Sequence, residues 1–281
     1  MLCSSKARLF EAKKPYIDWF FPHNDSLVSI AKEAMAEAWG TFLLTLIGPG
    51  AITALSYLDS TGRSGLLPDS ARLGFIGLAH GVALIAAAYS VGYISGAHIN
   101  PAVTIAHWRS KRINRAKVVP YILAQFLGAS IAGFTQLAIW WSASPAAYNV
   151  AKNTLLGDTT IGADFGVGPA LLVEVIGTAI LVFTIFGAND HEAGSSSKAF
   201  AGVAIGLVLA GIVWIFGPIS GASLNPARTF GPTLASAVFS LTPFSNYWIY
   251  VVGPLLGGLL GGFLYDAIRS DKTANAKRAV H

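Results

Sequence analysis

The chain has 281 residues, of which 53% are hydrophobic and 12% are charged, about half the charged share of a soluble domain. The formal net charge is +5, but Lys and Arg cluster at the ends of apolar segments and form no basic stripe with interleaved aromatics, which argues against a nucleic-acid partner. The single cysteine, Cys3, gives no basis for an internal disulfide, a thiolate metal cage or a catalytic Cys-His pair.

The chain opens with a polar, basic stretch, 1–28, which lacks the apolar core and cleavage site of a signal peptide. We expect a cytosolic N-terminal tail there and a second cytosolic tail at 269–281. Six apolar stretches lie between them, each near the length of about 20 residues that a helix needs to cross the hydrocarbon layer. They are found near 30–57, 73–94, 118–141, 169–187, 199–216 and 247–268. Because the stretches lack the alternation of a membrane barrel, the sequence predicts an all-α membrane protein with one channel domain, 29–268.

The distribution of basic residues predicts the orientation. The N-terminal region through Lys32, the connections 109–117 and 188–198, and the C-terminal tail hold fifteen of the nineteen Lys and Arg. Short cytosolic segments carry such an excess, so we expect these segments and both termini in the cytosol of a multi-pass cell-membrane protein.

The two halves of the chain repeat each other. The sequence EAWGT at 37–41 recurs as EVIGT at 174–178, and ISGAHINPAVT at 94–104 recurs as ISGASLNPART at 219–229. Each half, about 29–142 and 167–268, holds three crossings, so the repeats enter the membrane from opposite sides. Such inverted repeats place the functional site at their interface, near the midplane.

Two Asn-Pro-Ala turns belong at that interface: Asn100-Pro101-Ala102 and Asn225-Pro226-Ala227. Each opens a stretch, 102–109 or 227–238, that adds no full crossing, and Asn followed by Pro is a favourable helix start. We therefore predict two re-entrant half-helices whose amino ends meet in mid-membrane. Their positive dipole ends would repel cations, while the free side-chain amides of the two asparagines would donate hydrogen bonds to a passing oxygen.

Three charged residues are predicted at membrane depth. Arg228 follows the second turn, and a buried charge of this kind indicates function; the alternative is an interfacial arginine that reaches the headgroups. Glu37 and Glu174 occupy matched positions in the repeats. We expect them to accept backbone hydrogen bonds from the linkers before the half-helices, with a proton relay as the alternative.

These paired motifs resemble the aquaporin, or major intrinsic protein, family over about 33–266. The resemblance implies six tilted helices and two half-helices per pore, a homotetramer, and a channel that needs no cofactor or metal. It also implies an aromatic/arginine constriction formed by Phe75, Val213, Ala222 and Arg228, with His98 bracing the cytosolic pore mouth. His80 is expected to pack against a neighbouring helix, or else to make a polar contact within the bundle.

Val213 stands where water-selective relatives usually carry His, and Ala222 is small, so we expect a wide, partly apolar constriction. The predicted function is passive passage of water and small neutral solutes such as hydrogen peroxide, ammonia or small polyols, with ions and protons excluded. A glycerol facilitator is the first alternative, although Thr229 replaces the Asp that such relatives carry after the second motif. A secondary transporter using Glu37 and Glu174 is the second. A membrane enzyme lacks a recognisable nucleophile, base or metal set, and a non-conducting junction protein of the same fold stays open.

Overall fold

A computed structural model describes residues 27–62, 68–190 and 199–269. The predicted tails, 1–28 and 269–281, lie almost wholly outside these residues. Within the described part, six helices are long and apolar enough to cross a membrane, and no strand is present. The predicted all-α fold with six crossings is confirmed.

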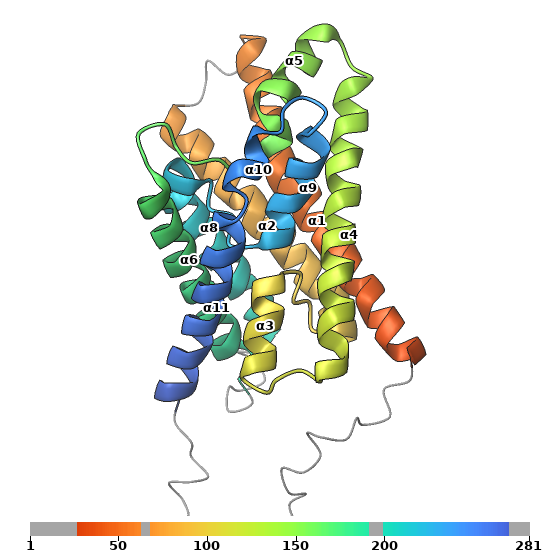
Figure 1. The fold of residues 1–281 in the computed structure, drawn as a ribbon, viewed down its shortest axis with the longest axis vertical. Helices are drawn as coiled ribbons and strands as arrows, with labels where there is room; N and C mark the ends of the chain where they lie inside the picture. The colour runs from red at the N-terminus through yellow and green to blue at the C-terminus, as the bar shows by residue number, and fades with distance from the viewer. Residues whose placement is uncertain (1–26, 63–67, 191–198, 270–281) are drawn as a thin grey trace, which may run out of the picture.

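Long helices make up most of the bundle in Figure 1. They are α1 (Leu27–Ser60), α2 (Asp69–Ser95), α4 (Arg115–Trp141), α6 (Val167–Ala188), α8 (Ala201–Ser220) and α11 (Ile249–Ile268). The shorter elements are the half-helices α3 (Pro101–Arg109) and α9 (Pro226–Ser236), the helices α5 (Pro145–Asn153) and α10 (Thr242–Asn246), and the 3₁₀ turn η2 (Leu155–Gly157). The sequence analysis did not predict α5. Its start carries the expected signal, because Ser144 accepts a hydrogen bond from the backbone N–H of Ala147 and Pro145 occupies the first turn.

Each half-helix packs against a long helix of the opposite repeat. The half-helix α3 lies mainly against α11, and α9 lies mainly against α4. In Figure 1, α3 occupies the lower part of the bundle and α9 the upper part. The two halves therefore exchange their short helices, which ties the inverted repeats into one body.

Glycine makes the closest of these helix contacts possible. A Cβ added to Gly133 of α4 would collide with the carbonyl oxygen of Gly231 on α9, and a Cβ on Gly231 would collide with the carbonyl of Ala129. The two backbones are in direct contact there, as small residues allow in membrane helix pairs.

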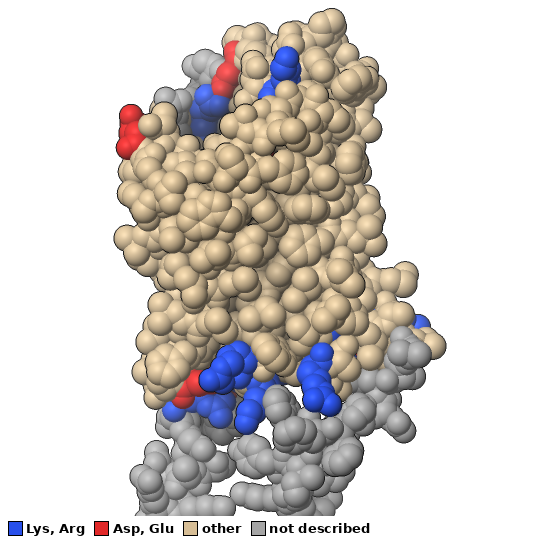
Figure 2. All heavy atoms as spheres, viewed as in Figure 1, with Lys and Arg blue, Asp and Glu red and all other residues tan. Residues whose placement is uncertain are grey.

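The charged side chains lie at the two ends of the visible face. Figure 2 shows a broad band without Lys, Arg, Asp or Glu, bounded below by a row of Lys and Arg. Many large apolar side chains on the outside of the long helices are exposed, among them Leu123 and Phe263. This is the surface of a protein whose middle section lies in hydrocarbon.

Candidate pore at the meeting of the half-helices

The linker that leads into α3 is held by one buried carboxylate. Oε1 of Glu37 accepts hydrogen bonds from Ser95 Oγ at 2.6 Å and from the backbone N–H of His98 at 2.9 Å. Oε2 accepts from the backbone N–H of Ile99 at 2.6 Å and from Gln125 Nε2 at 2.8 Å. These include the backbone contacts expected from the sequence, and Glu37 is fully buried.

The second repeat builds the same device. Oε1 of Glu174 accepts from Ser220 Oγ and from the N–H of Ser223, both at 2.8 Å, and Oε2 accepts from the N–H of Leu224 at 2.7 Å. A tyrosine that the sequence analysis did not single out adds to it, because the Tyr250 hydroxyl donates to the carbonyl of Ser220 at 2.9 Å. The hydrogen bonds that the Glu174 carboxylate accepts thus all come from one linker and the residue at the end of α8 before it.

The carboxylates hold backbone conformations that are costly for residues with side chains. Ile99 and Leu224 have φ values of 56° and 57°, and Ala97 and Ala222 have φ values of 49° and 45°. Such left-handed conformations outside glycine cost on the order of 1–3 kcal/mol each and persist only where the surrounding structure fixes them. The charge-assisted hydrogen bonds to Glu37 and Glu174 offset that cost. Their effect is to aim the carbonyls of Ile99 and Leu224 at the opposite half-helix.

The two asparagines cap their own helices and bridge to each other's linker. Asn100 Oδ1 accepts from the N–H of Ala102 at 2.8 Å, and its Nδ2 donates to the carbonyl of Leu224 at 2.7 Å. Asn225 Oδ1 accepts from the N–H groups of Ala227 and Arg228, and its Nδ2 donates to the carbonyl of Ile99 at 2.8 Å. The amino ends of α3 and α9 therefore meet, as predicted. The expectation of wholly free amides needs correction: one hydrogen of each amide is engaged, and the second hydrogen remains.

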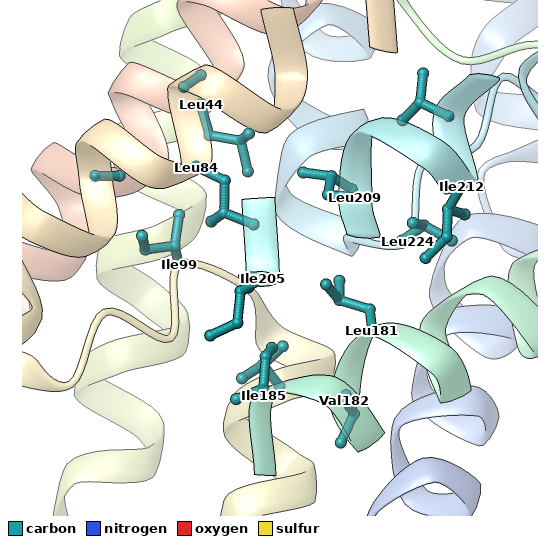
Figure 3. Packing of buried hydrophobic residues seen from close by; sticks show 14 of the residues in the cluster. Leu44, Leu84, Ile99, Leu181, Val182, Ile185, Ile205, Leu209, Ile212 and Leu224 are labelled. Atoms are coloured by element: carbon teal, nitrogen blue, oxygen red, sulfur yellow. The ribbon is translucent and has the colours of Figure 1, made fainter. Parts of the chain in front are cut away.

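A cavity of about 630 Å³ passes the two turns. Asn100 and Asn225 line it, and it extends in one direction to His98, Arg112 and Lys117. In the other direction it reaches His80 and Arg228. Figure 3 shows apolar side chains from several elements around the linker residues Ile99 and Leu224, including Leu44 of α1, Leu84 of α2, Leu181 of α6 and Leu209 of α8. The cavity thus has one mostly apolar wall and a polar wall supplied by the linkers and half-helix starts.

The predicted constriction residue Phe75 is wrong. Phe75 is 50% exposed and lies in a groove on the outside of α2 and α8, together with Leu78, Leu207 and Trp214. His80 faces the cavity from α2 and is 3% exposed. The physical reason is helical phase, because five residues turn the helix by about 140° beyond a full turn and so place the two side chains on different faces.

His80 contacts the buried arginine. Nη2 of Arg228 lies 3.0 Å from Nε2 of His80, and Nδ1 of His80 lies 2.8 Å from the carbonyl oxygen of Ile76. A guanidinium only donates and a carbonyl only accepts, so the ring is assigned as neutral, with its proton on Nδ1 and its Nε2 lone pair towards Arg228. Gly48 makes the room, since a Cβ there would collide with the ring. Of the two sequence expectations for His80, the polar contact within the bundle is the one found.

Arg228 is 1% exposed, so it does not reach for headgroups. Its Nε and Nη1 have no hydrogen-bond partner within the described residues. Buried donors are rarely left unpaired in folded proteins. Arg228 lines the cavity, so this incompletely paired guanidinium borders the path.

Val213 and Ala222 lie in the apolar cluster around the cavity and are 2% and 1% exposed. Neither is among the residues that line the cavity itself, so their part in a constriction stays a prediction. His98 does line it, and its Nδ1 lies 3.1 Å from Thr104 Oγ1. The His98 ring stacks on His107, with centroids 4.1 Å apart, which the sequence analysis missed.

The described residues contain no group of three or more His, Cys, Asp or Glu side chains arranged to hold a metal ion. The polar groups at the cavity are hydrogen-bond donors and backbone carbonyls. They can contact and orient a small neutral molecule.

Known proteins are similar to this chain in sequence and in fold. The sequence model of the major intrinsic protein family matches residues 25–265. The chain is 42% identical to aquaporin AqpM of Methanothermobacter marburgensis over 254 residues, which cover 87% of this chain and all of that protein. It is 33% identical to aquaporin Z of Bradyrhizobium diazoefficiens, covering 88% of this chain and 99% of that protein. Among solved structures, an aquaglyceroporin from Plasmodium falciparum has the same fold, with a TM-score of 0.72, 24% identity and coverage of 85% of this chain and 96% of that one.

Proposed function

The chain belongs to the major intrinsic protein family of passive small-solute channels, and from this premise we propose that it conducts water together with other small neutral solutes and excludes ions. The observation that carries the proposal is the reciprocal bond pair between Asn100 and Leu224 and between Asn225 and Ile99, beside one cavity that ends at Arg228. Aquaporins among the relatives support water as a substrate.

Ion exclusion rests on charge. Each half-helix start carries about half a positive charge, and the low-dielectric surroundings screen that charge weakly. Arg228 adds a full charge at the end of the same cavity. A cation entering from either side meets repulsion and finds few acceptors to replace its water shell, whereas a neutral oxygen finds donors.

Neutral solutes are matched by the donors that remain unpaired. The second amide hydrogens of Asn100 and Asn225 and the Nε and Nη1 groups of Arg228 can each donate to a solute oxygen. On this proposal, a molecule replaces part of its hydration along the path without being held tightly. The apolar wall opposite lets it move on.

The constriction on this proposal is formed by His80 and Arg228, with Val213 and Ala222 nearby. Small side chains at the last two positions favour passage of hydrogen peroxide, ammonia or small polyols beside water. The first alternative is a facilitator whose main substrate is glycerol or a similar solute. It would use the same half-helix geometry and cavity, although Thr229 stands where such relatives carry Asp. The aquaglyceroporin with the same fold supports this alternative.

The second alternative, a secondary transporter, would need ionisable groups accessible to the path. Glu37 and Glu174 are fully buried, bond to the linkers, and are not among the residues that line the cavity. This favours a structural role for both.

We further propose that the lower, Lys- and Arg-rich end in Figure 2 faces the cytosol of a cell membrane, so that both termini are cytosolic. We also propose that four chains form a homotetramer.

Stopped-flow light scattering of proteoliposomes with water, glycerol and hydrogen peroxide side by side tests the proposal. We expect fast water flow, slower but measurable uptake of the larger solutes, and a linear dependence of flux on concentration. Flux that saturates or follows an ion gradient would favour the transporter. Glycerol uptake with little water flow would favour the facilitator.

A further inference from the structure

Asp158 is a buried carboxylate that is not among the residues lining the cavity. It lies in the connection between α5 and α6, directly after η2, and is 8% exposed. The turn before it is seated on α1, because Gly157 has a φ of 75° and a Cβ there would collide with the carbonyl of Pro49. Leu156, fully buried, anchors the same turn. The position of Asp158 is therefore fixed by the bundle.

The carboxylate reaches across to the second half-helix. Oδ2 of Asp158 accepts from Thr233 Oγ1 of α9 at 2.8 Å, and Oδ1 accepts from the N–H of Thr159 at 2.8 Å. Thr159 in turn contacts Thr229 of α9, with 2.7 Å between the two hydroxyl oxygens. Asp158 and Thr159 together thus hold α9 at two positions one turn apart.

A chain of hydrogen bonds between hydroxyl groups leads from Thr159 to the pore, each hydroxyl donating to the next. Ser223 Oγ lies 2.5 Å from Thr229 Oγ1 and donates to the carbonyl of Asn225 at 2.9 Å. Each hydroxyl has one hydrogen, so Thr229 donates to Ser223 and Thr159 donates to Thr229. The chain ends at a capping asparagine and at Ser223, which lines the cavity.

Asp158 also faces the charge of Arg228, the residue before Thr229. The two interact electrostatically, and the Arg228 guanidinium has only His80 as a hydrogen-bond partner within the described residues. A buried charge is costly unless an opposite charge compensates it. Asp158 supplies such a charge.

We propose that Asp158 is a positioning residue for the outer half of the pore. It holds α9 through Thr233 and Thr159, and it draws the Arg228 guanidinium towards the pore wall. Protonation of Asp158 therefore narrows the passage. This inference rests on the proposed channel function. Protonation needs no rearrangement of the fold, because Thr233 Oγ1 also lies 3.0 Å from the carbonyl of Thr229. Its hydrogen can turn to that carbonyl while its lone pair accepts from the protonated carboxyl.

The change falls in an accessible pH range. Burial raises the pKa of the Asp158 carboxyl from its ordinary 3.8 to about 7, because loss of hydration penalises the ionised form. Below this value the carboxyl is neutral and no longer attracts Arg228; above it the carboxylate is ionised. The other groups around Asp158 are Arg228 on α9, Tyr247 at the C-terminal cap of α10 and Tyr250 on α11. Arg228 itself also interacts with Glu174 on α6 and contacts His80 on α2.

The test compares wild type, Asp158→Asn and Asp164→Asn in proteoliposomes from pH 5.5 to 8.5, with the glycerol-to-water permeability ratio as the readout. Asn keeps the shape of the neutral form and can donate to Thr233, so it represents the protonated state. Asp164 is an exposed carboxylate in the same connection and serves as the matched control. A defect confined to folding would lower both permeabilities together and leave the ratio unchanged.

In wild type and in Asp164→Asn we expect the ratio to fall about two- to fivefold on acidification, the size of a screened charge interaction, with a midpoint near pH 7. Asp158→Asn should stay at the low ratio throughout. A wild-type ratio that does not change with pH would overturn the inference. So would a pH dependence that persists in Asp158→Asn, because it would then belong to His80 or Glu174. Neither result would contradict the proposed channel function. If Asp158→Asn does not reconstitute, Thr233→Val takes its place: loss of the hydroxyl that donates to Asp158 should move the midpoint to higher pH, and an unmoved midpoint would overturn the inference. Wild-type vesicles that conduct neither solute at any pH would remove the proposed function as well.

Discussion

At the scale of single residues, the pore depends on side chains whose bonding capacity is only partly used. The Arg228 guanidinium contacts His80 through one nitrogen, and its other two nitrogens, Nε and Nη1, have no partner within the described residues. Each capping asparagine keeps one amide hydrogen. A residue with all its donors engaged could hold the helices but could not exchange hydrogen bonds with a passing molecule. This incomplete pairing separates the pore side chains from Glu37 and Glu174.

The correction from Phe75 to His80 gives a paired prediction. His80→Ala should raise glycerol permeability relative to water at least several-fold, because it removes a ring beside Arg228. Phe75→Ala, on the outer face, should leave the ratio unchanged. Solute uptake by reconstituted protein measures both. A changed ratio in Phe75→Ala with none in His80→Ala would restore the aromatic at 75 to the constriction.

Val213 allows a prediction in the opposite direction. Val213→His should lower the passage of glycerol and hydrogen peroxide relative to water, because a larger, polar ring would narrow an apolar wall. Swelling and uptake assays give the relative permeabilities. If they are the same as in wild type, Val213 does not border the narrow part of the path.

The spacing of residues along α2 could have identified His80 as the constriction residue, although its residue type did not suggest it. Seven residues of α2 line the cavity; Tyr89 and Ile94 are two of them, and the other five, Ser95, Gly92, Ala88, Leu84 and His80, are spaced about one turn apart. Phe75 breaks that spacing. The resemblance predicts an aromatic in the constriction, whereas the position with the right helical phase carries His80.

At the scale of elements, each half-helix depends on the linker before it for its position, and each linker depends on one buried carboxylate. Two αL residues in each linker point a carbonyl at the opposite asparagine, and a single carboxylate fixes each linker. The sequence predicted the helices, the half-helices and the carboxylate contacts, because Asn-Pro starts and matched Glu positions are local signals. The crossed bonds between the linkers, and the turn η2 with Asp158, depend on contacts distant in sequence and could not be predicted.

Glu174→Gln should destabilise the protein by about 1–3 kcal/mol, the cost of a buried unpaired donor. The amide has one oxygen to replace two, so its NH₂ group would face either Leu224 N–H or Ser223 N–H. Thermal unfolding in detergent measures the effect. As a control, Thr184→Ala on the exposed face of α6 should be close to neutral. Equal stabilities for both variants would mean that the linker does not depend on the carboxylate.

At the scale of the whole molecule, the inverted repeats are held together by the exchange of α3 and α9 and by direct backbone contacts at glycine. The repeat and its opposite insertion were readable from the sequence, since an odd number of crossings per half requires them. The identity of the packed helix pairs was not, because many glycines in the chain are equally compatible with close approach.

A pair of glycine substitutions tests this packing. Gly133→Ala should lower thermal stability by a few kcal/mol or prevent folding, because its Cβ meets the backbone of α9. Gly211→Ala, where a Cβ would meet nothing within 4 Å, should be neutral or stabilise α8 by up to about 1 kcal/mol. Yield and unfolding temperature in detergent report both, and equal behaviour would show that α4 and α9 are not in contact.

The central claim is that two opposed half-helix starts and Arg228 form a path that admits neutral molecules and rejects ions. Osmotic water flow and ionic conductance, measured on the same reconstituted membranes, test it most directly. The account predicts water permeability at least about tenfold above protein-free vesicles with no added conductance, since a charge at this site faces a barrier of several kcal/mol. Water flow no faster than in protein-free vesicles, or an ionic current that accompanies it, would contradict the account.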